Sequence, residues 1–277
     1  MITKPLMRYH GAKFRLADWI MQFFPPHDTY VEPFGGSAGI LLQKPRSYSE
    51  VYNDLDSTIV NVFRVLQDPA TALLLKRKLE STPYAREEFQ LAYQHTSDPV
   101  ESARRTLIRA SMGFGSAGAT KHKTGFRVDT AREYSTSAHL WPRLPLQLPL
   151  FTERLKGVLI ENKPAVDVIK NHDRSSTLFY VDPPYRFDTR QMGNHRHYYS
   201  HEMTDDQHQE LLQELMKLDG MVILSGYDSE QYNDTLTGWT RYATSARISA
   251  GRGTSTRTEV VWLNPSCTNL KPQRDLI

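Results

Sequence analysis

The sequence predicts an α/β protein in which one sheet is interrupted by a mostly helical insertion. Two observations carry this expectation. Short apolar segments alternate with amphipathic segments at both ends of the chain, an order typical of β-α-β units and of a parallel sheet. Between them, residues 69–112 show helical patterns alone. A chain of 277 residues can hold one large domain, or one domain that carries an insertion.

The first elements follow one another as strand, turn, helix, strand and helix. We expect a strand over residues 29–34, a glycine turn over 35–39 and a helix that starts at Ile40. A second strand is expected over residues 49–54. The next helix, over residues 57–68, has apolar residues at the i, i+3, i+4 and i+7 positions: Ile59, Val62, Phe63 and Leu66.

The middle of the chain is predicted to be the insertion, over residues 67–150. Its helices are expected over residues 70–81, 85–95 and 99–112, and a glycine-rich basic loop follows to about residue 136. The segment 140–151 contains three prolines, which break helices and strands, so we expect it to lead back to the sheet as an irregular connection.

The last third returns to the sheet pattern. Strands are expected over residues 156–163, 177–181, 221–228 and 258–264, with helices over 165–171 and 205–218 between them. Thr204 and Gln207 have the spacing of a capping box at the start of the second helix. Residues 1–66 and 151–277 therefore form the predicted sheet domain.

The composition favours a soluble, cytoplasmic protein. Hydrophobic residues make up 39% of the chain, and no run approaches the roughly 18 apolar residues of a membrane span. The N-terminus lacks the apolar core of a signal peptide, and the single cysteine, Cys267, excludes an internal disulfide.

Positive charge is concentrated in the predicted insertion. The net charge of the chain is only +3, yet residues 104–143 hold eight arginine and lysine residues against two acidic residues. Such a segment suits a polyanion such as a nucleic acid. The alternative is an ordinary solvated face.

The glycine turn predicts a backbone cradle for a ligand. In "EPFGGSAGI" a strand, two glycines and a helix start follow one another, and glycines let a ligand approach the main chain. No Lys-Ser or Lys-Thr pair follows, which argues against a phosphate-binding P-loop. Asp54 lies 18 residues after Gly36, where an acidic side chain would suit ribose hydroxyls. Asp56 is the rival acid, past the strand end. The pattern favours a nucleoside cofactor over a plain glycine turn.

Two other motifs are weaker. "GFGSAG", residues 113–118, matches a dinucleotide fingerprint in letters but follows a predicted helix rather than a strand, so we expect a basic loop that contacts phosphates. His195, His197 and His201 cluster in a segment without a helix signal, and metal sites need three or four ligands of fixed geometry. We expect no metal there, but a polar loop over the site.

The strand that ends in "DPPY" suggests chemistry on an exocyclic amine. Asp182 and the main-chain carbonyl of Pro183 could accept the two hydrogens of such an amine and localise its lone pair. Pro183 and Pro184 fix the backbone and offer no competing N–H. Tyr185 could supply a flat face for a nucleobase, an interaction worth about 1–3 kcal/mol. The amine would then attack an electrophilic methyl group. The alternative is a structural turn.

The ordered motifs resemble the Dam-type (D12 class) DNA adenine-N6 methyltransferases. The matching segments are "YHGAK", "YVEPFGGSAGI", "YNDLD", "TPYAREEF", "FYVDPPY", "LSGYDS" and "TRTEVVWLN". The resemblance implies a Rossmann-like class I methyltransferase sheet with a target-recognition insertion, and S-adenosylmethionine as cofactor. It also implies cofactor contacts from Tyr9, Lys13, Phe34, Gly35, Gly36, Asp54 and Asp182. Tyr9 stands where this family often has tryptophan, and the insertion matches least well.

The sequence therefore predicts a site-specific DNA adenine methyltransferase that acts on a base flipped out of the duplex. Expected DNA contacts are Arg109, Lys121, Lys123, Arg127 and Arg252; the last lies in residues 249–257, which could equally form a plain hairpin turn. Methylation of cytosine N4, of RNA adenine or of a protein glutamine, and a catalytically silent DNA-binding protein, are the alternatives. The recognition sequence, GATC or another, the oligomeric state and any link to a restriction enzyme or a mobile element are not indicated.

Overall fold

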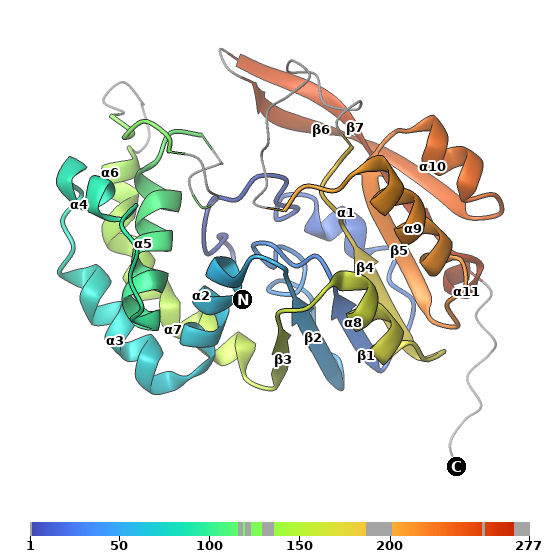
Figure 1. Cartoon of the computed structure of the whole chain (residues 1–277), viewed down its shortest axis with the longest axis horizontal. Helices are drawn as coiled ribbons and strands as arrows, with labels where there is room; N and C mark the ends of the chain where they lie inside the picture. The colour runs from blue at the N-terminus through green and yellow to red at the C-terminus, as the bar shows by residue number, and fades with distance from the viewer. Residues whose placement is uncertain are drawn as a thin grey trace.

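A seven-stranded sheet forms the centre of the protein (Figure 1). The computed structural model describes residues 2–115, 119, 123–128, 136–186, 201–250 and 253–268. The strand order is β3-β2-β1-β4-β5-β7-β6. Strands β1 to β5 pair in parallel, and β7 runs antiparallel between β5 and β6. The strands are β1 Thr29–Glu32, β2 Ser49–Asn53, β3 Val158–Glu161, β4 Thr177–Val181, β5 Met221–Tyr227, β6 Thr240–Ala250 and β7 Gly253–Leu263.

This order confirms the predicted α/β, Rossmann-like class. The arrangement 3-2-1-4-5 is that of doubly wound sheets, in which strands are added first on one side of β1 and then, from β4 on, on its other side. A hairpin of β6 and β7 completes the far edge. Strand β6 was not expected from the sequence, and it pairs with β7 from Thr240↔Leu263 to Ala250↔Gly253.

Alternating side chains of the central strands fill two cores, one on each face of the sheet. On β1, Tyr30 belongs to one core and Val31 to the other. The first core also holds Ile59 and Phe63 of helix α2 (Ser57–Gln67). The second is covered by α8 (Ala165–His172) and α9 (Asp205–Leu215). The period of two along a strand thus produces the layered fold.

A layer of helices packs on α2 (Figure 1). It lies far from β6, the strand that forms one edge of the sheet. It contains α3 (Pro69–Glu80), α4 (Arg86–Leu91), α5 (Pro99–Met112), α6 (Ser137–Leu140) and α7 (Leu144–Leu155). The expected helices at 70–81, 85–95 and 99–112 correspond to α3, α4 and α5. Smaller helices are α1 (Ala17–Met21), α10 (Glu230–Thr235) and α11 (Pro265–Thr268). None of the helices in the described ranges has the length and apolarity to span a bilayer.

Two expectations about local structure were wrong. The proline-rich segment is not an irregular connection: it forms α7, with Pro145 in the first turn, where no N–H is needed, and Pro149 inside the helix. Leu148, Phe151 and Leu155 bury its inner face.

The expected helix at Ile40 is instead a series of turns over residues 36–43. The backbone of Leu41 is used by tertiary partners: its N–H donates to Glu32 Oε1 at 2.7 Å, and its carbonyl accepts from Arg154 at 2.6 Å. Pro45 then prevents continuation.

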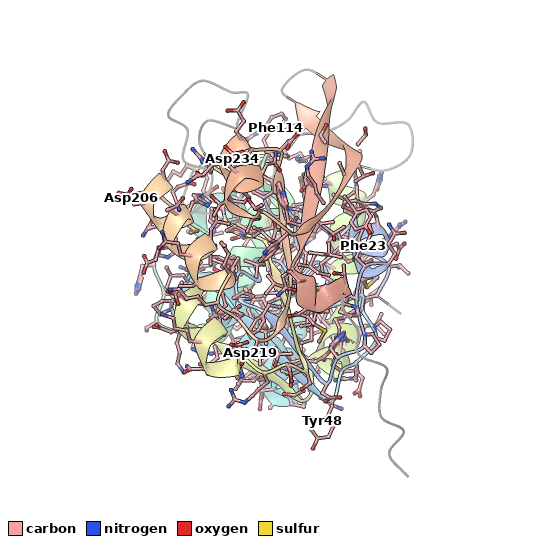
Figure 2. The ribbon with its side chains drawn as sticks, turned by 90° about the vertical axis from the view of Figure 1, so that its right-hand side faces the viewer. Phe23, Tyr48, Phe114, Asp206, Asp219 and Asp234 are labelled. Carbon is pink, nitrogen blue, oxygen red and sulfur yellow. The ribbon has the colours of Figure 1, made fainter. Side chains whose placement is uncertain are left out.

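The two ends of the sheet differ in what they carry. Tyr48, 96% exposed, precedes β2 and lies at the end where the parallel strands begin; Phe114, 65% exposed, lies near the opposite end (Figure 2). The carboxyl ends of β1, β2 and β4 therefore lie on the same side as Phe114, which follows α5 (Figure 2), and as the upper ends of β6 and β7 in Figure 1.

Candidate active site

A cleft of about 920 Å³, part of it open to solvent, lies where β1, β2 and β4 end. The segment that contains Tyr9 and Lys13 forms one wall, and His201 to Met203 form another. The predicted cofactor-binding residues all line it: Tyr9, Lys13, Phe34, Gly35, Gly36, Asp54 and Asp182. Ligands of doubly wound sheets bind at this place, beyond the carboxyl ends of the strands.

The glycine turn after β1 is packed so closely that side chains would not fit. A Cβ on Gly35 would lie 2.2 Å from Cε2 of Tyr52, whose ring is buried. Gly36 has a φ of +48°, and a Cβ there would lie 2.8 Å from Cε1 of Tyr9. The Tyr52 hydroxyl donates to the Gly36 carbonyl at 2.7 Å. The turn is thus a rigid cradle that exposes main chain to the cleft.

Asp54 is tied to this cradle by its carboxylate. One oxygen accepts from the Gly36 N–H and the other from the Asp56 N–H, each at 2.8 Å. Burial raises the pKa of Asp54 to about 6, although both backbone hydrogen bonds lower it. A carboxylate has about four acceptor positions, so each oxygen can accept a further hydroxyl. This leaves Asp54 able to bind a diol from the cleft.

Asp182 directly follows β4, and one of its two carboxylate oxygens accepts a hydrogen bond while the other has no partner in the described residues. Oδ2 accepts from Lys13 Nζ at 2.9 Å. Oδ1 is buried and has no hydrogen-bond partner within the described ranges. Burial raises the pKa of Asp182 to about 6, while the Lys13 ammonium lowers it. A buried acceptor without a partner at the edge of a cleft suits a ligand that donates a hydrogen bond.

Two carboxylates near Asp182 were not singled out from the sequence. Glu259 of β7 is 4% exposed and lies 3.3 Å from Lys13 Nζ. Glu32, at the end of β1, lines the cleft and accepts from Tyr30 and Leu41; burial raises its pKa to about 7. Both acids lie in otherwise apolar strand segments of the sequence. An acidic residue in such a segment is the signal that could have singled them out.

Tyr185 does not present an open ring to the cleft. It is 8% exposed, and its hydroxyl donates to Glu259. Lys13 Nζ lies 4.6 Å from the ring centroid, and the Tyr227 ring packs against it edge-on at 4.4 Å. Pro184 lines the cleft together with Asp182, whereas Pro183, between them in the chain, is buried. Base stacking on Tyr185 stays a prediction.

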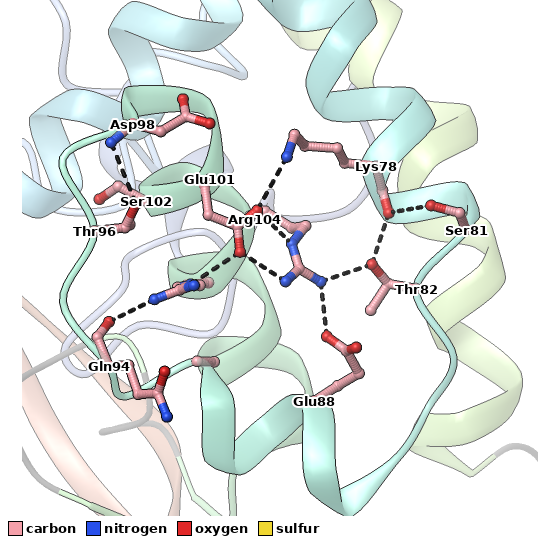
Figure 3. Close-up of polar contacts among 12 residues, drawn as sticks. Lys78, Ser81, Thr82, Glu88, Gln94, Thr96, Asp98, Glu101, Ser102 and Arg104 are labelled. Carbon is pink, nitrogen blue, oxygen red and sulfur yellow. Dashed lines mark hydrogen bonds and ion pairs between the residues drawn. The ribbon is translucent and has the colours of Figure 1, made fainter.

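Part of the predicted basic segment serves the fold rather than a ligand. Arg104 pairs with Glu101 at 2.7 Å and with Glu88 at 2.8 Å, and it also bonds Thr82 (Figure 3). Arg105 bonds Glu101 as well. Arg104 thus joins α5 to α4 and to the segment after α3, and Arg105 joins α5 to the segment after α4. The charge count therefore overstates the positive charge that a polyanion would meet.

The predicted DNA contacts fall into three groups. Arg109 bonds the Ala92 carbonyl and Thr106, which fixes it in the helical layer. Lys123 is exposed, and Arg127 is half-buried beside the Gly113 carbonyl, to which it donates at 3.3 Å. Lys121 and Arg252 lie outside the described residues. All five stay predictions as DNA contacts.

Lys123 also borders a second cleft, in the helical layer. Arg86, Phe89, Tyr93 and Phe126 also line it, and its volume is about 580 Å³, part of it open to solvent. Lys123 Nζ lies 5.9 Å from the centre of the Tyr93 ring, and the Arg86 guanidinium lies 4.9 Å from that of Phe126. A surface of rings and cations suits nucleic acid.

No metal centre is formed by the part of the chain that the structure describes, since no group of three histidine, cysteine or acidic residues there could hold an ion. His201 lines the first cleft. His195 and His197 lie outside the described residues.

The comparison with protein families assigns the chain. The family model for D12 class N6 adenine-specific DNA methyltransferases matches residues 9–243. The chain belongs to this family. The match spans the cradle, the helical layer and the "DPPY" turn of the methyltransferase, and it confirms the resemblance seen in the motifs.

Other comparisons add little. No curated protein matches the methyltransferase. A solved structure similar to it is titled as the X-ray structure of precorrin 8W decarboxylase, the product of gene MT0146 in the Methanobacterium thermoautotrophicum genome. That chain shares 11% identity, with a TM-score of 0.38, over 95% of this chain and 96% of the other. A similarity of this size carries no argument about function.

Proposed function

We propose that the protein transfers a methyl group from S-adenosylmethionine to N6 of an adenine that is flipped out of double-stranded DNA. The observation that carries the proposal is Asp182: a half-buried carboxylate directly after a strand, with Oδ1 buried and without a hydrogen-bond partner in the described residues, on the same cleft as the glycine cradle. Family membership supports adenine N6 in DNA over cytosine N4 or RNA adenine as the target.

The cleft residues fit S-adenosylmethionine. Gly35 and Gly36 line the cleft with main chain, and Asp54 retains acceptor positions for the ribose hydroxyls. Phe34 and Tyr9 offer apolar surface. When bound, this cofactor would supply a methyl group on a positively charged sulfur, which the carboxylates lining the cleft would attract.

Asp182 and Pro183 would prepare the target amine. The lone pair of N6 is delocalised into the purine ring, which makes the amine a weak nucleophile. Oδ1 of Asp182 is free to accept one N–H, and the Pro183 carbonyl is the candidate acceptor for the other. Two accepted hydrogen bonds would hold the nitrogen closer to tetrahedral geometry and direct its lone pair to the methyl carbon.

The protonation state of Asp182 would limit this step at low pH. With a pKa of about 6, the group is mostly ionised at neutral pH and mostly protonated below pH 6. A protonated carboxyl would lose acceptor capacity, so the rate should fall on the acid side. The N6 proton leaves after methyl transfer, when the nitrogen carries a positive charge. Asp182 can accept this proton and later release it to solvent.

DNA would approach the face that carries the cleft. An adenine inside a duplex cannot reach a carboxylate in a cleft, so the target must leave the stack. Lys123 and Arg127, together with Lys121 and Arg252, would hold the flanking phosphates.

The decisive test compares Asp182→Asn with the wild type on unmethylated DNA. Mass spectrometry of digested DNA should show N6-methyladenine with the wild type and a loss of at least about 100-fold with the variant, the order expected for a lost electrostatic contact to a reacting group. Asp234→Asn, an exposed aspartate on α10 (Figure 2), is the matched control and should keep full activity. Full activity of Asp182→Asn would refute the mechanism, and N4-methylcytosine as product would refute the target.

A further inference from the structure

One carboxylate on the hairpin edge of the sheet contacts the catalytic turn from outside the cleft. Glu259 Oε1 accepts the Tyr185 hydroxyl and lies 3.3 Å from Lys13 Nζ. Lys13 in turn donates to Asp182 Oδ2 at 2.9 Å. Glu259 and Lys13 are 4% and 5% exposed. The contact chain therefore runs from β7 to Asp182 through buried groups.

The backbone fixes Glu259 from two sides. It sits in β7, where it faces Tyr227 of β5 and Thr244 of β6 in the sheet register. The Tyr227 ring packs against the Tyr185 ring, 4.4 Å away between centroids. Glu259 is thus held by paired strands, and Tyr185, in the turn after β4, packs on a residue of β5. Such support keeps a functional group in place.

The charges in this cluster are unequal. Asp182 and Glu259 are two carboxylates, and Lys13 is the cation that lies within ion-pair distance of both. Lys13 also donates to the Gly11 carbonyl at 2.8 Å. Because the Lys13 ammonium lies beside two carboxylates, the negative charge of Glu259 partly cancels the effect of its positive charge on Asp182. Electrostatic effects of this kind are large where water is excluded.

We propose that Glu259 is a positioning residue for methyl transfer: it orients Tyr185 and Lys13 around Asp182, and it keeps the Lys13 charge from weakening Asp182 as a hydrogen-bond acceptor. The inference rests on the proposed function of Asp182. It adds a role for a strand residue that does not line the cleft.

The proposal makes opposite predictions for two neutral variants. Within the described residues, the titratable groups around Asp182 are Lys13, Glu259, Tyr185, Tyr180 and Glu32. Burial is the main cause of the raised pKa of Asp182; Lys13 lowers that pKa and Glu259 raises it. Glu259→Gln should therefore lower the pKa of Asp182, and Lys13→Gln should raise it.

The pKa can be measured without activity. Carboxyl ¹³C NMR of aspartate-labelled full-length protein, with Asp182→Asn to assign the signal, follows the titration in the wild type and in both variants. Opposite shifts of the Asp182 titration support the proposal. Identical titration curves in wild type and Glu259→Gln overturn it, whatever the enzyme turns out to methylate.

Steady-state kinetics test the positioning role. At saturating DNA and cofactor, kcat of Glu259→Gln should fall by about tenfold or more, because small displacements at a reacting centre cost that much, with KM for both substrates changed far less. The acid limb of the kcat profile should move to lower pH. Glu259→Asp keeps the charge, so its acid limb should stay in place while its shorter side chain still lowers kcat.

Two further results separate the possible failures. Should Glu259→Gln not fold, Tyr185→Phe removes the hydroxyl donor and keeps the ring, and it should lower kcat more than KM. Wild-type kcat in both Tyr185→Phe and Glu259→Asp would overturn the proposal. Absence of N6-methyladenine with the wild type would instead overturn the proposed function, and the NMR titration would still decide the role of Glu259.

Discussion

The glycine cradle gives a prediction in which stability and binding change separately. The perturbation is an added methyl group at three positions: Gly35→Ala, Gly36→Ala and, as matched control, Gly157→Ala. Gly36 and Gly157 both have positive φ, +48° and +79°, but a Cβ on Gly157 meets nothing within 4 Å. The control therefore isolates the cost of backbone strain.

The structure sets the size of each effect. A left-handed backbone at alanine costs about 1–2 kcal/mol, which is all that Gly157→Ala should lose. Gly36→Ala adds only displacement of Tyr9, whose half-buried ring can move, and should lose a similar amount. In Gly35→Ala the new Cβ would lie 2.2 Å from the buried Tyr52 ring. Overpacking of about 1–3 kcal/mol and a weakened Tyr52–Gly36 hydrogen bond of about 1 kcal/mol give a loss of about 2–4 kcal/mol.

Thermal unfolding and calorimetric titration with S-adenosylmethionine read out the two effects. At about 2–4 °C per kcal/mol, Tm should fall most for Gly35→Ala and about equally for the other two variants. Affinity for the cofactor should fall in Gly36→Ala, because Tyr9 lines the cleft, and stay unchanged in Gly157→Ala. Equal Tm values for Gly35→Ala and Gly157→Ala, or equal affinities for Gly36→Ala and Gly157→Ala, would refute the packing argument.

Three more predictions follow from single side chains. Lys123→Gln should weaken DNA binding and reduce the slope of the logarithm of the DNA-binding constant against log salt by about 1. Arg104→Gln should leave that slope unchanged and lower Tm. Fluorescence anisotropy at several salt concentrations compares the two slopes. The pKa of Asp182 is raised to about 6 in the folded state, so ionisation of Asp182 between pH 4 and pH 7 destabilises the fold. The free energy of unfolding of Asp182→Asn, measured by urea titration, should therefore rise relative to that of the wild type over this range. A difference that does not change with pH would contradict this. Asp54→Asn should bind S-adenosylmethionine at least about tenfold more weakly, because one of its two backbone donors then meets an amide group; unchanged affinity would exclude Asp54 from the cofactor site.

Local sequence signals predicted the parts of the site that depend on local chain geometry. Gly35, Asp54 and Asp182 each end or follow a strand, and parallel strands bring such ends together. The pairing of Lys13 with Asp182 could not be predicted, because it joins residues 169 positions apart. The partners of Glu259 could not be predicted for the same reason, since they come from the turn after β4 and from the N-terminal segment.

The errors have physical causes as well. Proline counts suggested a broken segment at 140–151, but Pro145 sits where a helix needs no donor, and packing on α3 offsets the bond lost at Pro149. The charge count of residues 104–143 treated Arg104 as available, although Glu101 lies outside the counted segment and binds it. Tertiary partners decide such cases, and they are not visible in a local window.

The position of Glu259 in β7 has a consequence for how the protein is made. During synthesis Lys13 leaves the ribosome early, the "DPPY" turn much later, and Glu259 only after β6. Domains begin to fold while synthesis continues. Before β7 emerges, a nascent chain can bring Lys13 to Asp182, but it lacks the second acid and the strand that holds Tyr185 in place. The complete cluster around Asp182 is therefore assembled only after β7 has been synthesised, later than the helical layer.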